Sequence, residues 1–267
     1  ITGDGIAMAA EVGANLVDME QIQLLYLGNP FNGGMTYYTP RDLSGTDQII
    51  FVNKEGKRFV QEDGRRDVIC CALIDQTDGM MYILESGDGN AVDPDELLTG
   101  DGHKARDAEA QGYLLIADTL EEMAAKIGCD AATLQATVDS FNAAVKAGYG
   151  IMQIYKNPSE YDVSLKRDKT PITVADRTAH MIIKEYLGPT RIPVLSEEGR
   201  EMLYDERRNW ELFWLVDPLD GTVEFIKGNN EFTVNIALMS ENRCVCSVIY
   251  VPYLQKAYVA SQNMGAY

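Results

Sequence analysis

The sequence predicts an α+β protein with two lobes that meet near residue 145. In the C-terminal lobe, an amphipathic helix is expected over 174–186, because apolar residues recur there at helical spacing. Three runs rich in β-branched and aromatic residues follow, each bounded by turn-forming residues. We expect these runs to form sequential antiparallel strands over 232–238, 245–251 and 256–260.

The N-terminal lobe is expected to hold short helices and a hairpin. Residues 48–60 hold two apolar runs around an Asn-Lys-Glu-Gly turn, which is typical of paired strands. Thr119 precedes Glu122 by three residues, as in a capping box, and Asp130 can cap the next helix. Further elements are expected as helices over 6–12, 121–127 and 131–146 and as a strand over 16–23.

The composition argues against nucleic-acid-binding and membrane-spanning classes of protein. The formal charge is −18 at pH 7, and a field of that sign repels the phosphate backbone of DNA and RNA. Small anionic substrates remain compatible with it where metal ions neutralise a pocket. Five cysteines without a CxxC spacing fit small core residues in a reducing cytoplasm, and no apolar run reaches the roughly 18 residues of a membrane helix. We therefore expect a cytoplasmic protein with neither a nucleic-acid nor a membrane partner.

The residues suited to chemistry gather in a turn after a predicted buried strand. Residues 213–216 are apolar, and the proline after Asp217 is expected to end that strand because proline cannot donate to a ladder. Asp220 follows three residues later, so two carboxylates and the Leu219 carbonyl can converge on one point. These are hard oxygen ligands of the kind that Mg²⁺ prefers. The alternative for such a turn on its own is a solvated Asp-Pro turn.

Other stretches accompany this turn. The sequence reads DKTPITVAD at 168–176, PVLSEEG at 193–199 and FWLVDPLDGTVEFIKGNNEFTVNIAL at 213–238. Over about residues 145–267 the chain resembles the N-terminal half of the lithium-sensitive, magnesium-dependent phosphatases related to inositol monophosphatase. The branch it resembles most is that of the 3'(2'),5'-bisphosphate nucleotidases. The resemblance implies hydrolysis of a small phosphorylated nucleotide or sugar, such as adenosine 3',5'-bisphosphate to AMP and phosphate.

This resemblance also implies a set of site residues. The implied Mg²⁺ ligands are Glu197, Asp217, the Leu219 carbonyl and Asp220. Asp176 with Thr222 is implied to orient and deprotonate the attacking water. Glu198 is expected to support Glu197, and His180 to lie at the surface rather than to bind metal. The family's later Trp-Asp pair, which completes its second metal site, has no counterpart here, so hydrolysis is expected to be impaired.

A second resemblance covers about residues 1–147. TGDGIAMAAEVGANLVDME, IIFVNKEGKRFVQEDGRRDV and TLEEMAAKIGCDAATLQATVDSFNAAV are similar to the middle and capping region of fumarate reductase-type flavoproteins, with the urocanate reductase branch nearer. The resemblance implies that Arg66 donates a proton to substrate. The alternative is a surface ion-pair cluster of Arg65, Arg66 and Asp67. That family's FAD-binding segments have no counterpart here, so FAD is expected only if they are supplied.

The two resemblances meet without a linker. We expect a flavoprotein-cap-like fragment over 1–147, followed over 148–267 by the N-terminal αβ sheet half of an inositol monophosphatase-like fold. One helix is expected to serve both patterns, because its apolar face continues across the junction. Three functions remain open: a Mg²⁺-dependent phosphatase, a fragment of a FAD-dependent urocanate or fumarate reductase-like oxidoreductase, or an artificial or mis-assembled chimera with neither activity.

Overall fold

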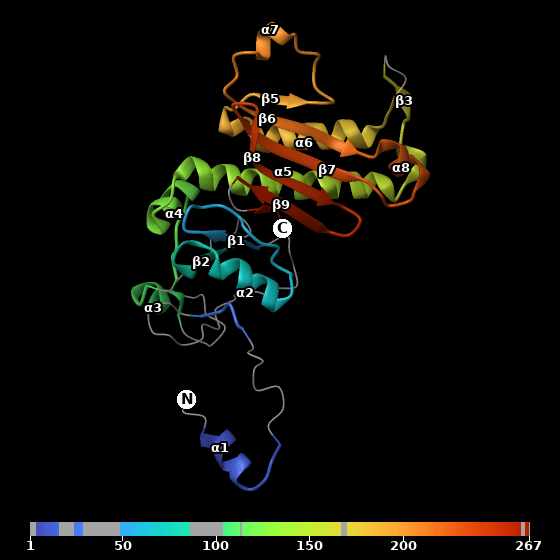
Figure 1. Cartoon of the computed structure of the whole chain (residues 1–267). Coiled ribbons are helices and arrows are strands. Elements are labelled where there is room, and N and C mark those ends of the chain that lie inside the picture. The colour runs from blue at the N-terminus through green and yellow to red at the C-terminus, as the bar shows by residue number, and fades with distance from the viewer. Residues whose placement is uncertain are drawn as a thin grey trace.

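The computed structural model is a mixed α/β structure, as the sequence predicts (Figure 1). Two helices, α5 and α6, lie against one face of a six-stranded sheet, and a smaller region with a two-stranded sheet precedes them along the chain. The strand expected over 16–23 lies outside the described residues. The structure describes residues 4–15, 24–28, 49–85, 104–112, 114–166, 170–262 and 265–266.

The six-stranded sheet has the strand order β10-β9-β8-β7-β6-β5. Neighbouring strands pair antiparallel from β10 to β6, and β5 pairs parallel with β6. The three sequential antiparallel strands predicted from the sequence are therefore confirmed. The strands are β5 (Val194–Ser196), β6 (Leu212–Asp220), β7 (Thr233–Ser240), β8 (Arg243–Val251), β9 (Lys256–Ser261) and β10 (Gly265–Ala266).

One face of this sheet is buried against α5 and α6. Alternate residues of β7, Val234, Ile236 and Leu238, lie in the main core, because successive side chains of a strand point to opposite faces. Trp214 and Val216 of β6 join them from the neighbouring strand. The helices are α5 (Ala131–Tyr155) and α6 (Val174–Leu187).

Helix α5 runs without a break for 25 residues through the junction of the two resemblances. Asp130 caps it, accepting a hydrogen bond of 2.8 Å from the Thr133 amide, as the sequence predicts. Two glycines let it approach its neighbours closely. A Cβ at Gly148 would lie 2.3 Å from a ring carbon of Tyr250, and one at Gly150 would lie 2.8 Å from Ile182. The single helix serving both patterns is thus confirmed.

The predicted hairpin over 48–60 is wrong in its second strand. β1 (Ile49–Asn53) pairs antiparallel with β2 (Met81–Glu85), and the nearer segment makes a single bridge between Val52 and Arg58. The reason is a buried carboxylate: Glu62 accepts a 2.9 Å hydrogen bond from the Phe51 amide and pairs with Arg58. That ion pair turns the segment after Arg58 inward.

β1 contributes to two hydrophobic clusters. Ile49 and Phe51 pack in a small N-terminal core, whereas Ile50 and Val52, on the opposite face, join the main core with Trp214. The N-terminal region and the C-terminal sheet therefore share packing through this strand. The remaining elements are α1 (Asp4–Glu11), α2 (Arg66–Ile74), α3 (Ala105–Ala110), α4 (Leu120–Ile127), β3 (Ser164–Leu165), β4 (Pro171–Ile172), α7 (Tyr204–Arg207) and α8 (Thr222–Lys227), with 3₁₀ turns at Thr77–Gly79, Pro158–Glu160 and Gly188–Thr190.

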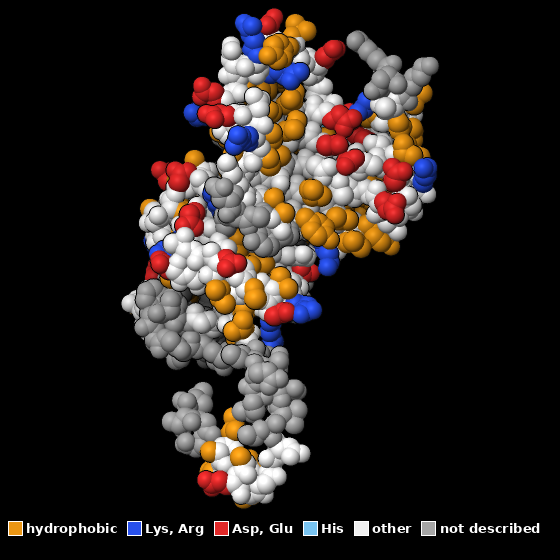
Figure 2. Space-filling view, viewed as in Figure 1, with side chains coloured by type: hydrophobic (Ala, Val, Ile, Leu, Met, Phe, Trp, Pro, Cys, Tyr) orange, Lys and Arg blue, Asp and Glu red, His pale blue; other side chains and the backbone are white. Residues whose placement is uncertain are grey.

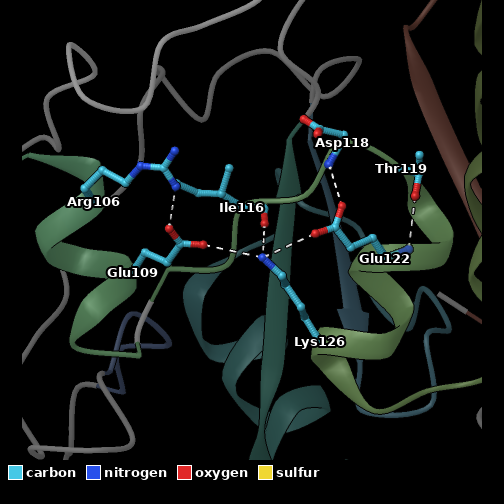
Figure 3. Close-up of polar contacts among 7 residues, drawn as sticks. All are labelled: Arg106, Glu109, Ile116, Asp118, Thr119, Glu122 and Lys126. Carbon is cyan, nitrogen blue, oxygen red and sulfur yellow. Dashed lines mark hydrogen bonds and ion pairs between the residues drawn. The ribbon is translucent and has the colours of Figure 1, made fainter.

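Polar contacts centred on Lys126 join α3 to α4 (Figure 3). Its ammonium group donates to the Ile116 carbonyl and lies 3.5 Å from Glu109 and 3.7 Å from Glu122. The Glu122 amide donates to Thr119, which confirms the cap, but the Glu122 carboxylate accepts from the Asp118 amide and not from Thr119, so the predicted capping box is only half formed. These contacts are largely solvent-exposed, so they orient the two helices more than they stabilise the fold. No helix in the described ranges of the chain combines the length and apolarity needed to cross a membrane.

Candidate metal centre

The end of β6 carries the two predicted aspartates. The strand was expected to stop at Asp217, but pairing resumes at Asp220 after a shift in register. Asp217 lies opposite Asn235, and Asp220 lies opposite Thr233. The proline between them has no N–H to donate, which accounts for the irregularity without ending the strand. In Figure 2 acidic side chains gather near the place where β6 ends in Figure 1.

A glycine turns the chain sharply after β6. Gly221 has φ 91°, and a Cβ there would lie 2.7 Å from the Glu231 carbonyl oxygen. Any other residue would therefore meet both backbone strain and a clash at this position. The turn starts α8 at Thr222 and so aims the Thr222 hydroxyl back toward the strand end.

Helix α6 supplies the third carboxylate, Asp176, at its buried N-terminal end. In a capping box, Asp176 Oδ2 accepts 2.7 Å and 2.6 Å hydrogen bonds from the amide and hydroxyl of Thr173. Its other oxygen, Oδ1, accepts a 2.9 Å hydrogen bond from the Thr222 hydroxyl. Thr222 Oγ1 also lies 3.2 Å from the Leu219 carbonyl oxygen. Asp176, Thr222 and Leu219, which the sequence singled out, are therefore brought together.

The central carboxylate, Asp217, has an unsatisfied oxygen. Among the described residues, its buried Oδ1 atom has no hydrogen-bond partner. Burial, followed by the negative charges of Glu197 and Asp220, raises the pKa of Asp217 to about 7. The amide of Glu197 donates to the Val216 carbonyl at 3.0 Å, so the start of the Glu197 turn is fixed to β6. An orphaned carboxylate oxygen beside two further carboxylates is the donor set that a hard divalent cation fits.

The outer carboxylates contact other groups. Lys166 Nζ lies 2.8 Å from Glu197 Oε1 and 2.5 Å from Glu198 Oε1. Burial opposes the charge of this ammonium, but its hydrogen bonds to the two glutamates outweigh burial and raise the pKa of Lys166. Asp220 Oδ2 accepts a 3.1 Å hydrogen bond from Asn235.

These contacts explain why the three carboxylates do not converge on one point, although burial and the charges of Glu197 and Asp220 raise the pKa of Asp217. Within the described ranges, no three His, Cys, Asp or Glu side chains form a group that could hold a metal ion as they stand. Glu197, whose amide donates to Val216, and Asp220, further along the same strand as Asp217, nevertheless both lie near Asp217. Glu197 and Asp220 are exposed and can change rotamer, whereas the orphaned Asp217 oxygen is fixed by burial.

His180 does not lie free at the surface, as the sequence led us to expect. Its ring is half-buried, and Nδ1 lies 2.9 Å from the Ser196 hydroxyl oxygen. The spacing could have indicated that His180 is not fully exposed. His180 follows Asp176 by four residues, which places both on one face of α6. Lys166 is a neighbour of Glu197 and Glu198 that the sequence did not reveal, because residue type alone does not identify its partners.

Arg66, the residue implied by the flavoprotein resemblance, lies elsewhere. It is exposed at the start of α2, in the N-terminal region, and is not among the residues that meet at the end of β6. Its neighbour Arg65 forms an exposed ion pair with Asp67, with Nε and Oδ1 3.0 Å apart. The surface ion pair weighed from the sequence is therefore present for Arg65.

Family models match both regions of the chain. The inositol monophosphatase family matches residues 134–267, and the FAD binding domain matches residues 1–180. The chain therefore belongs to the inositol monophosphatase family through its C-terminal half and to the FAD binding domain family through its N-terminal region. The two matches overlap over 134–180, which contains most of α5 and the first half of α6.

Curated relatives also match the inositol monophosphatase region of the chain. The 3'(2'),5'-bisphosphate nucleotidase CysQ of Salmonella typhimurium is 46% identical over 119 residues, which is 44% of this chain and 48% of that protein. The CysQ proteins of Escherichia coli K12 and Buchnera aphidicola are 45% identical over 119 residues and 46% identical over 116 residues. They cover 44% and 43% of this chain, and 48% and 43% of their own lengths. The chain spans about half the length of the curated relatives it matches.

Solved structures also match part of the chain. CysQ from Bacteroides thetaiotaomicron, described as a bacterial member of the inositol monophosphatase family, is 49% identical with a TM-score of 0.43. It covers 49% of this chain and 47% of its own. The extragenic suppressor protein SuhB of Bartonella henselae is 34% identical with a TM-score of 0.45, covering 49% of this chain and 51% of its own.

Proposed function

We propose that residues 148–267 carry a Mg²⁺-dependent phosphomonoesterase site of the 3'(2'),5'-bisphosphate nucleotidase type. The observation that carries the proposal is the contact between Thr222 and Asp176, 46 residues apart, at the end of the strand that carries the orphaned oxygen of Asp217. The printed names of the CysQ relatives support a small phosphorylated nucleotide, such as adenosine 3',5'-bisphosphate, as substrate. Residues 1–147 form the other proposed unit, a flavoprotein-like fragment.

The proposed Mg²⁺ ligands are Glu197, Asp217, the Leu219 carbonyl and Asp220. Glu197 and Asp220 would hold the cation after rotamer changes away from Lys166 and Asn235. Bound Mg²⁺ supplies charge stabilisation for phosphoryl transfer and lowers the pKa of a coordinated water. The hard oxygen character of all four ligands fits this cation better than zinc or copper.

Asp176 and Thr222 are proposed to handle the proton of the attacking water. Thr222 donates its single hydroxyl proton to Asp176 Oδ1, which leaves the lone pairs of its oxygen free to accept from water. As water attacks phosphorus, its proton passes to Thr222 Oγ1 while the threonine proton moves to Asp176 Oδ1. Thr173 holds Asp176 in place through Oδ2, so the accepting oxygen keeps its direction.

The experiment is phosphate release from adenosine 3',5'-bisphosphate by the purified chain, with Mg²⁺ and with EDTA. Asp176→Asn and Thr222→Val are each expected to lower the Mg²⁺-dependent rate by about a hundredfold or more, because both interrupt the proton relay. Asp162→Asn is the control, since Asp162 pairs with Arg177 at the surface. Full activity in both site variants would overturn the proton relay. A wild-type chain without Mg²⁺-dependent release would overturn the activity and favour a joining of two incomplete proteins.

The FAD binding domain match supports a second candidate. This is a FAD-dependent reductase of the urocanate or fumarate type with Arg66 as proton donor, for an assembly in which the flavin-binding segments are supplied. The exposed position of Arg66 on α2 leaves it accessible to such a partner segment.

A further inference from the structure

A hydrogen bond joins the two elements that deliver Asp176 and Glu197. His180 of α6 and Ser196 of β5 are linked at 2.9 Å between Nδ1 and Oγ. His180 stands one helical turn after Asp176, and Ser196 directly precedes Glu197. The contact therefore ties the helix of the proposed proton acceptor to the strand of a proposed metal ligand.

The turn that carries Glu197 is tight and is fixed at three points. The Glu197 amide bonds to Val216 of β6, and the Gly199 amide bonds back to the Ser196 carbonyl, each at 3.0 Å. A Cβ at Gly199 would lie 3.0 Å from that carbonyl and 3.8 Å from His180 Cε1, so the imidazole ring packs against the turn. The backbone contacts hold the turn to its own strand and to β6. The His180 contact is the one among these three that relates it to α6.

We propose that His180 is a positioning residue that acts through Ser196 to direct Glu197 toward Asp217. This inference rests on the proposed function and adds to it a residue that binds neither metal nor substrate. The contact fixes the backbone from which the Glu197 side chain extends, so less conformational freedom is lost when Glu197 binds a cation, and the His180–Ser196 contact raises metal affinity. Removing either His180 or Ser196 leaves the Glu197 turn held by its backbone hydrogen bonds but less fixed relative to α6.

The test is Mn²⁺ binding to the full chain, followed by the loss of the electron paramagnetic resonance signal of free Mn²⁺. His180→Phe and Ser196→Ala are each expected to raise the Mn²⁺ dissociation constant about three- to tenfold, the worth of one hydrogen bond. The double variant is expected to bind no more weakly than either single variant, because both remove the same contact. His180→Asn, whose amide reaches the position of Nδ1, is expected to bind almost as wild type.

Thr190→Val is the matched control. Thr190 accepts from the Trp214 indole at 3.2 Å, so its loss is expected to lower the melting temperature while leaving Mn²⁺ affinity unchanged. Wild-type affinity in both His180→Phe and Ser196→Ala would overturn the positioning role and leave the metal site standing. Additive losses in the double variant would also overturn it. If wild type and Asp217→Asn alike fail to bind Mn²⁺, the proposed function is refuted, and this inference with it.

Discussion

Replacing Asp217 with asparagine removes the charge that burial and two neighbouring carboxylates oppose. The pKa of Asp217 is raised from 3.8 to about 7, first by burial and then by Glu197 and Asp220. A carboxyl group whose pKa is higher in the folded state stabilises the fold below its unfolded pKa, and that contribution is lost as the pH rises through the folded pKa. In EDTA, wild type should therefore lose stability relative to Asp217→Asn between about pH 4 and pH 7.

The size of the effect follows from the same pKa values. Fully converted, a rise from 3.8 to about 7 corresponds to roughly 4 kcal/mol. Asp217 is only partly buried, so solvent screening reduces the expected difference to about 1–2 kcal/mol. Asp217→Asn should thus be more stable by about 1–2 kcal/mol at pH 8 and equal to wild type near pH 4. Urea unfolding at both pH values measures this difference.

Added Mg²⁺ should reverse the order of the two proteins at pH 8. At a hundred times its dissociation constant, the cation stabilises wild type by about 2.7 kcal/mol, which exceeds the difference of about 1–2 kcal/mol, and it has no such effect on Asp217→Asn. Asp205→Asn, in the exposed first turn of α7, serves as the control and should behave as wild type. Equal unfolding curves for wild type in Mg²⁺ and EDTA, or a difference that does not change with pH, would refute the reasoning.

Three further outcomes are expected. Glu62→Leu should lower the free energy of unfolding by about 3–5 kcal/mol, because it leaves the buried Arg58 charge uncompensated. Gly148→Ala should lower it by about 1–3 kcal/mol, because the added methyl group meets the Tyr250 ring. The purified chain should show no flavin absorbance, because the described N-terminal residues form a two-stranded antiparallel sheet rather than the parallel βαβ unit of a dinucleotide site.

Matched control variants separate these specific effects from a nonspecific loss of stability. Lys54→Ala breaks an exposed pair with Asp78 and should change stability by less than about 1 kcal/mol, unlike Glu62→Leu. Gly188→Ala meets nothing within 4 Å and should be close to neutral, unlike Gly148→Ala. If a variant and its control lose equal stability, the packing described around Arg58 or Tyr250 is contradicted. Yellow protein after gel filtration would contradict the flavin prediction.

Local patterns predicted most of the described C-terminal fold. The strand over 232–238, the helix over 174–186 and the cap at Asp130 depend on neighbours in sequence, so they could be predicted without a structure. The partner of β1 could not, because its true partner lies about 30 residues away and the nearer candidate is diverted by a buried ion pair. The same limit hid the contact of His180, since its partner is set by tertiary packing.

The unbroken course of α5 constrains how its two ends can be joined. Each residue added to an α-helix turns everything beyond it by about 100° and advances it by about 1.5 Å. One extra residue between Ala144 and Gly148 would rotate Gly148 away from Tyr250 and carry Ile151 out of the core. The two family regions are therefore held in a fixed rotational phase. Two halves joined within α5 both keep their packing only when the number of helical residues between them preserves this relative rotation.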